Sequence, residues 1–160
     1  MIKIVSGGQT GVDRGALDAA IARGFPYGGW CPEGRKAEDG VIPRNYSMTE
    51  LPGAGYRQRT KRNVIDSDGT VIIYFGFLKG GTEQTVMYCI KERKPYLLLD
   101  AEEIPTKRAS QRILDFIRRN GVSILNVAGP RAGEEPRGHE YAEKVISGSL
   151  NMLLKGSWTE

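Results

Sequence analysis

A glycine-rich turn between a β-branched run and a helical pattern is the feature that most constrains how this chain can fold. Residues 2–5 read Ile-Lys-Ile-Val, residues 6–11 read Ser-Gly-Gly-Gln-Thr-Gly, and apolar residues recur at helical spacing from Val12. This order predicts a strand, a loop and a helix. The turn carries no bulky side chain, so its amide groups can approach a ligand at the positive end of the helix dipole. It therefore indicates an anion site; the alternative is a tight connection without a ligand, since neither the G-x-G-x-x-G nor the P-loop spacing is present.

Two further glycine-containing turns strengthen the prediction of a ligand. Residues 70–75 form the clearest buried strand and lead to a Gly-Gly-Thr stretch at 80–82, whose Thr82 is the expected helix N-cap. Residues 122–127 form the last strand and lead to a third glycine turn at 128–133. In a parallel sheet, ligands bind at the carboxyl ends of the strands, so the glycine turns after the first and third strands are expected to converge on one pocket.

Strands and helices alternate along the chain. Helices are expected at residues 11–23, 56–66, 82–93, 106–120 and 138–155, and strands at 2–5, 25–30, 70–75, 96–99 and 122–127. The alternation predicts an α/β fold, a three-layer Rossmann-like doubly wound sheet of about five mostly parallel strands. The simplest arrangement is the strand order 2-1-3-4-5, with the ligand crevice between strands 1 and 3. We expect one domain over residues 1–155 and a loose tail at 156–160.

A long irregular segment, residues 31–55, separates the second strand from the second helix. It mixes apolar and charged residues, which is not a disordered composition. Loops of this length in compact domains are usually functional. We interpret it as an ordered loop over the site, with a short helical turn near residues 46–51.

Composition and charge narrow the classes of protein to be considered. The 160 residues carry a formal charge of +4, which suits an anionic small-molecule ligand and also allows weak contact with nucleic acid. Cys31 and Cys89 lie far apart and His139 is the single histidine, so neither a zinc site nor a multi-histidine metal site is expected. No apolar run approaches the roughly 18 residues of a membrane span. With no basic-then-apolar leader before the first strand, we expect a protein of the reducing cytoplasm.

The candidate site consists of hydrogen-bond donors and arginines, which can hold an oxyanion with two parallel hydrogen bonds. Asp13 is assigned with Thr10 to a capping box, Cys31 to packing and His139 to a solvated position. No catalytic group and no metal site is expected. The candidate ligand-binding residues are Gly7, Gly8, Gln9, Thr10, Gly11, Arg14, Arg35, Arg59, Gly80, Gly81, Thr82, Thr85, Gly129 and Arg131.

Several unusual blocks occur in an order that resembles a known family. They are SGGQTGVDR at 6–14, GWCPEGR at 29–35, AEDG at 37–40, Arg59-Thr60 with Asn63-Val64, Gly80-Gly81-Thr82 with Thr85, and LNVAGPR at 125–131. These blocks, over about residues 4–131, resemble the putative molybdenum carriers, the molybdenum-cofactor carrier proteins. The resemblance implies a Rossmann-like fold, often a homotetramer, that binds molybdenum cofactor (molybdopterin) or a related anion. It further implies a carrier role, with a molybdoenzyme as the acceptor.

Two alternative functions stay open. The glycine turns are distantly similar to lysine decarboxylase-like nucleoside-monophosphate phosphoribohydrolases, whose P-G-G-x-G-T-x-x-E motif supplies a catalytic glutamate. Here Thr85 stands at the glutamate position, and Glu83 comes two residues too early and points elsewhere on a helix, which argues against hydrolysis. The other alternative is nucleic-acid binding, supported only by the basic helix with Arg57, Arg59, Lys61 and Arg62, a pattern more typical of a solvated face.

Overall fold

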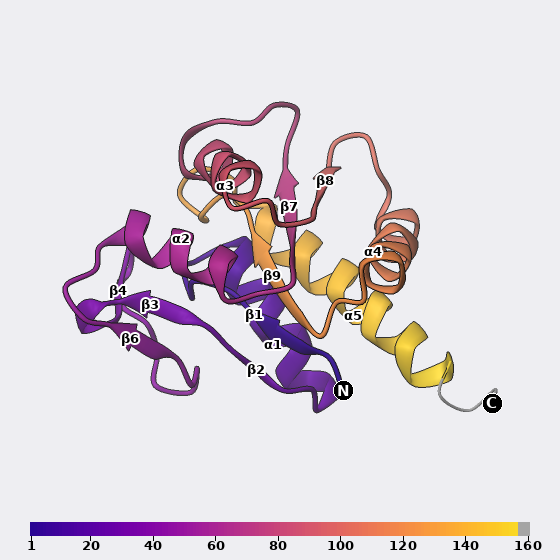
Figure 1. Cartoon of the computed structure of the whole chain (residues 1–160), viewed down its shortest axis with the longest axis horizontal. Coiled ribbons are helices and arrows are strands. Elements are labelled where there is room, and N and C mark those ends of the chain that lie inside the picture. The colour runs from indigo at the N-terminus through magenta and orange to yellow at the C-terminus, as the bar shows by residue number, and fades with distance from the viewer. Residues whose placement is uncertain (157–160) are drawn as a thin grey trace.

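A five-stranded parallel sheet forms the centre of the molecule (Figure 1). The computed structural model describes residues 1–156. Every neighbouring pair of strands in the sheet is parallel. The strands are β1 (Lys3–Val5), β2 (Tyr27–Gly28), β7 (Gly69–Tyr74), β8 (Tyr96–Asp100) and β9 (Ile124–Ala128). With helices on both faces of this sheet, the predicted three-layer Rossmann-like α/β fold is confirmed.

The order of the strands differs from the prediction. The sheet runs β2-β1-β9-β7-β8, so the last strand lies between the first and the third. Leu125 of β9 pairs with Ile4 on one side and Gly69 on the other. The predicted order 2-1-3-4-5 is therefore wrong. After β8 the chain crosses back over the sheet through α4 (Thr106–Asn120) and inserts β9 at the centre, where its middle residues are buried.

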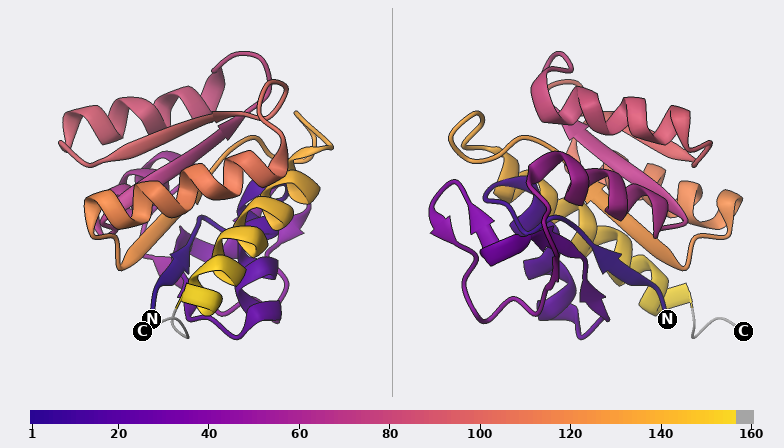
Figure 2. Two further views of the ribbon diagram at one scale, coloured as in Figure 1. Left: turned by 90° about the vertical axis from the view of Figure 1, so that its right-hand side faces the viewer. Right: turned by 60° about the vertical axis from the view of Figure 1, so that its left-hand side comes forward.

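Helices cover both faces of the sheet, and the alternation of side chains along β7 shows which helix lies on which face. Val71 and Ile73 belong to a core with α1 (Val12–Arg23), α4 and α5 (Gly138–Gly156). Ile72 points to the other face and packs with α2 (Tyr56–Ile65) and α3 (Gly80–Lys91). Figure 2 shows the sheet running between these two helical layers.

The predicted second strand divides into two short strands. Gly29, with φ of 125°, separates β2 from β3 (Trp30–Pro32), and β3 leaves the central sheet. β3 pairs instead with β6 (Thr49–Leu51), so the helical turn predicted near residues 46–51 is wrong. Along the chain, the antiparallel pair β4 (Lys36–Ala37) and β5 (Gly40–Val41) comes between β3 and β6. These elements form a small lobe beside α2, opposite α4 and the C-terminal part of α5 (Figure 1).

The long segment is ordered by its own core, as predicted. Cys31, Ile42 and Tyr46 are buried against Leu17 of α1, which confirms the packing role assigned to Cys31. The Arg35 guanidinium donates hydrogen bonds to the backbone carbonyls of Ile42, Pro43 and Tyr46. The Arg35 side chain thus holds residues 42–46 in place through their backbone carbonyl groups.

The structure also bears on two remaining predictions, the absence of a membrane span and the loose C-terminal tail. Within residues 1–156, none of the helices combines the length and the apolar character that a membrane span requires. Gly156, the first residue of the predicted loose tail, is the last residue of α5. Residues 157–160 of that tail lie outside the described residues.

Candidate functional site

A cavity of about 580 Å³ lies where the carboxyl ends of β1 and β9 meet α2 and α3. Its walls come from the turns after β1 and β9, from the inner side of α2 and from the first turns of α3. Of the predicted ligand-binding residues, those that line it are Gly7, Gln9, Arg59, Gly80, Gly81, Thr82, Thr85, Gly129 and Arg131. This is the edge of the sheet at which parallel α/β proteins bind ligands.

Arg59 is the central cation of the cavity wall. Its guanidinium lies against Gly7, because a Cβ on Gly7 would stand 1.9 Å from Nη1 of Arg59. The same guanidinium lies 5.5 Å from the centre of the Tyr56 ring, within cation–π range. The buried Nε of Arg59 has no hydrogen-bond partner among the described residues. A buried cationic donor without a partner carries a desolvation cost, which an anionic ligand in the cavity would offset.

Asp13 is the buried carboxylate of the same wall. Its Oδ2 accepts a hydrogen bond from the backbone N–H of Gln9 at 3.2 Å and lies 3.5 Å from Nη1 of Arg59. Burial raises the pKa of Asp13 from 3.8 to about 6, although the charge of Arg59 and the N–H groups of Gln9 and Gly7 oppose the shift. The Asp13 carboxyl group therefore changes its charge near pH 6, and its ionised form competes with any anion for Arg59.

The predicted capping box at the first turn is wrong. The N-cap of α1 is Gly11, which has φ of 81° and offers no side chain. Asp13 instead reaches back to Gln9, and the Thr10 hydroxyl accepts a hydrogen bond from the backbone N–H of Ala132 at 3.1 Å. A Cβ on Gly11 would stand 2.5 Å from the carbonyl oxygen of Pro130, so glycine allows the first and third turns to approach.

The N-terminus of α3 opens onto the cavity without a side-chain cap. The helix begins at Gly80 after Lys79, so the prediction of Thr82 as N-cap is wrong by three residues. A Cβ on Gly80 or Gly81 would meet nothing within 4 Å, which leaves room over the first amide groups of the helix. Those free N–H groups and the helix dipole favour an anion at this end. The Thr85 hydroxyl donates to the carbonyl of Gly81 at 3.0 Å, one turn earlier.

Five predicted ligand-binding residues do not line the cavity: Gly8, Thr10, Gly11, Arg14 and Arg35. The Arg14 guanidinium donates to the Gly8 carbonyl at 3.0 Å and to both oxygens of Asp39 at 2.6 and 2.8 Å. Arg35 is engaged within the long segment, as described above. These two arginines stabilise the first turn and the segment behind it, because all three guanidinium nitrogens of Arg14 and the Nε and Nη2 of Arg35 donate hydrogen bonds within the protein.

The long segment packs against the first turn and contacts Arg131 and Tyr56 at the edge of the cavity, but it does not line the cavity itself. A Cβ on Gly8 would stand 2.9 Å from Cδ1 of Ile42, and the side-chain oxygen of Gln9 accepts a hydrogen bond from the backbone N–H of Glu38 at 2.9 Å. None of residues 31–55 lines the cavity. The expectation that this segment covers the site is therefore wrong: it supports the turn from behind.

Sequence reasoning missed several residues of the cavity wall. Asp13 was assigned to a cap, and Tyr56, Asn63 and Asn126 were not considered as ligand-binding residues. The amide of Asn126 on β9 donates to the Thr70 hydroxyl of β7 at 3.3 Å and joins the two central strands at the cavity floor. An acidic residue directly after a glycine turn was the available signal for Asp13. Among residues 1–156, those that line the cavity include no cysteine and no histidine.

The sequence and the fold of this chain are similar to those of known proteins. The model of the circularly permutated YpsA SLOG family matches residues 4–150. The chain belongs to this family. Among solved structures it is similar to the putative molybdenum carrier protein from Syntrophus aciditrophicus SB, with 43% sequence identity and a TM-score of 0.91. That alignment covers 94% of this chain and 95% of the other. Comparison with curated proteins gave no match.

Proposed function

We propose that this member of the circularly permutated YpsA SLOG family is a carrier that binds a phosphate-bearing small molecule in the cavity without changing it chemically. The cargo that we propose first is molybdenum cofactor (molybdopterin). The observation that carries the proposal is Arg59, a cation in the cavity wall whose buried Nε has no partner among the described residues. The similarity to a protein described as a molybdenum carrier supports this choice of cargo.

Two groups of donors support binding of an oxyanion. On one side stands the Arg59 guanidinium, which lies against Gly7 in the cavity wall. On the other side stands the uncapped N-terminus of α3, with open space over Gly80 and Gly81. A phosphate between them would receive charge-assisted hydrogen bonds and the field of the helix dipole.

The donor set of the cavity also indicates how a molybdenum-bearing cargo would be held. The described lining residues offer no thiolate and no imidazole, the side chains that most often bind transition metals in proteins. Cys31 and Cys89 are buried elsewhere. We therefore propose that the chain holds the organic part of the cargo and its phosphate, and that the metal keeps the ligands it arrives with.

Calorimetric titration with molybdopterin, molybdate, AMP and inorganic phosphate tests the proposal. We expect the phosphate-bearing compounds to bind and Arg59→Gln to weaken them by at least tenfold, the cost of losing a charged hydrogen bond of about 1.5–3 kcal/mol. Lys61→Gln is the matched control, since it removes a charge from the same helix at a residue that does not line the cavity. No binding by any compound, or equal loss in both variants, would contradict the proposal.

The setting of the carrier is part of the same proposal. We place it in the cytoplasm as a homotetramer that delivers its cargo to a molybdoenzyme acceptor. Light scattering of the purified chain measures the assembly, and transfer of cofactor to an apo-molybdoenzyme measures delivery. Release of a free base from a nucleoside monophosphate in the same samples would favour the hydrolase alternative instead.

A further inference from the structure

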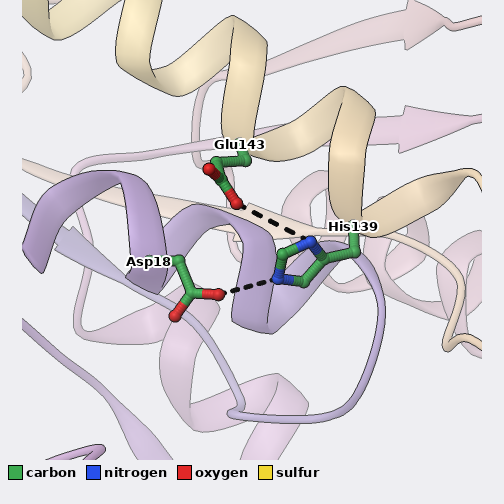
Figure 3. Close-up of side chains that lie close together, drawn as sticks. All are labelled: Asp18, His139 and Glu143. Atoms are coloured by element: carbon green, nitrogen blue, oxygen red, sulfur yellow. Dashed lines mark hydrogen bonds and ion pairs between the residues drawn. The ribbon is translucent and has the colours of Figure 1, made fainter. Parts of the chain in front are cut away.

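A cluster of three ionisable side chains lies between α1 and α5, apart from the residues that line the cavity (Figure 3). Asp18 comes from α1, and His139 and Glu143 come from the first turns of α5. Nε2 of His139 lies 2.7 Å from Oδ2 of Asp18, and Nδ1 lies 3.7 Å from Oε2 of Glu143. The sequence predicted a solvated position for His139; the structure places its imidazole between two carboxylates.

The packing of the two helices brings these groups together. A Cβ on Gly15 would stand 2.4 Å from the carbonyl oxygen of His139, so only glycine allows α1 and α5 to approach this closely. Asp18 lies one turn after Gly15, and a short side chain therefore reaches the neighbouring helix. His139 and Glu143 are four residues apart, a spacing that places both on one face of α5.

Asp18 is also held from its other side. The Tyr46 hydroxyl donates a hydrogen bond to Oδ1 of Asp18 at 2.7 Å, which leaves Oδ2 directed at the imidazole. Tyr46 belongs to the long segment and is buried against Leu17. The carboxylate is therefore fixed in orientation by a partner that does not neutralise it.

The charge of the cluster favours a cation. Neighbouring basic groups are paired elsewhere: Arg14 with Asp39, and Lys144 with Glu140. Within residues 1–156, His139 is the one basic side chain that pairs with Asp18 or Glu143. The side chains of Asp18, His139 and Glu143 are 32%, 41% and 48% exposed, so ions from water can reach all three.

We propose that Asp18, His139 and Glu143 form a binding site for a divalent transition-metal ion of the zinc class. One donor atom from each residue lies within 4.8 Å of the others. Ligands that share a zinc ion stand about 3–4 Å apart. The two ring nitrogens of His139 face different carboxylates, so the imidazole must turn for one nitrogen to bind a metal ion shared with both. The imidazole selects Zn²⁺, Co²⁺ or Ni²⁺ over Ca²⁺ and Mg²⁺, which prefer oxygen alone. Three protein ligands leave the remaining positions to water.

A metal ion needs a free nitrogen on the imidazole ring, and His139 offers Nδ1 or Nε2. The Tyr46 hydroxyl orients the Asp18 ligand from outside, and such outer contacts change metal affinity by roughly 10–100-fold.

Calorimetric titration of the metal-stripped, untagged chain with Zn²⁺ tests the site. We expect one equivalent to bind, with His139→Gln abolishing binding and Glu143→Gln weakening it at least tenfold. Because His139 is the single histidine of the chain, no other imidazole can replace it. Glu140→Gln is the matched control, since this exposed carboxylate lies next to His139 but pairs with Lys144. Equal binding by His139→Gln and the wild type, or no binding by the wild type, would overturn the proposal.

Two further measurements separate this site from folding effects and from the cavity. Tyr46→Phe keeps the buried ring and loses only the hydroxyl, so we expect about tenfold weaker Zn²⁺ binding. Co²⁺ added to the wild type should give a visible absorption band that Zn²⁺ displaces and that His139→Gln lacks. Arg59→Gln should bind Zn²⁺ as the wild type does, and His139→Gln should bind phosphate as the wild type does. The metal site and the anion-binding cavity are thus tested independently, and failure of one proposal leaves the result for the other unchanged.

Discussion

Replacement of Asp13 by Asn should change how the stability of the protein depends on pH. The folded-state pKa of Asp13 is about 6, against an ordinary value of 3.8, because the carboxylate is buried. A folded-state pKa above the unfolded one means that the fold favours the neutral acid. The contribution of Asp13 to stability is therefore full below about pH 4 and is lost as the pH rises through 6. The shift of about two units corresponds to about 3 kcal/mol at pH 7.5.

Urea unfolding at pH 4.5, 5.5, 6.5 and 7.5 measures the effect. Asn keeps the size of the side chain and an acceptor for the Gln9 N–H, but it does not ionise. Relative to the wild type, the unfolding free energy of Asp13→Asn should rise by about 2 kcal/mol between pH 4.5 and 7.5. Asp115→Asn, on the exposed side of α4, is the control and should run parallel to the wild type. A parallel profile for Asp13→Asn would refute the reasoning.

The same ionisation should control the affinity for anions. Oδ2 of Asp13 lies 3.5 Å from Nη1 of Arg59, so the ionised carboxylate competes with phosphate for that cation. Repulsion between the two anions of about 1–2 kcal/mol corresponds to roughly tenfold in affinity. Between pH 5 and pH 7.5 the wild type should lose about tenfold in phosphate affinity relative to Asp13→Asn, a comparison in which the ionisation of phosphate itself cancels. Calorimetry at both pH values checks this, and weaker binding by Asp13→Asn at pH 7.5 would contradict it.

Further substitutions test the two sides of the first turn. Gly7→Ala should weaken phosphate binding about tenfold, as Arg59→Gln does, because the new Cβ would displace Nη1 of Arg59 from a distance of 1.9 Å. Gly28→Ala, whose Cβ meets nothing closer than 3.6 Å, is its control in calorimetry. Arg14→Lys should lower the unfolding free energy by about 1–3 kcal/mol, since lysine cannot bridge both oxygens of Asp39 and the Gly8 carbonyl. Thermal unfolding measures that loss, and phosphate affinity should change far less than in Arg59→Gln.

The parts of the fold that follow from local pattern could be predicted from the sequence. Residues 70–75 are apolar on both faces, which only a covered central strand allows, and β7 is that strand. Gly24 and Gly121 directly follow the helices predicted at 11–23 and 106–120, and both adopt the left-handed conformation at the C-caps of α1 and α4. In each case the residue itself sets the backbone, so the prediction needs no knowledge of distant contacts.

The directions of the arginine side chains could not be predicted in this way. Arg14, Arg35 and Arg59 are the same residue type near glycine turns, yet only Arg59 lines the cavity. The donors of Arg14 and Arg35 are taken by Asp39 and by backbone carbonyls of the long segment. Those partners become neighbours only after residues 31–55 fold back onto α1, and residue type alone does not specify that step.

The strand order brings the third glycine turn, residues 128–133, to the cavity. In the predicted order 2-1-3-4-5, the last strand would lie three positions from β1, about 14 Å across the sheet at about 4.8 Å per strand. Gly129 and Arg131 would then stand beyond the reach of a ligand held at Gly7. In the observed order β9 is the direct neighbour of both β1 and β7, and Asn126 bonds to Thr70 beneath the cavity. Local pattern identifies each of the three turns, but only the return of the chain through α4 to the centre of the sheet makes them one site.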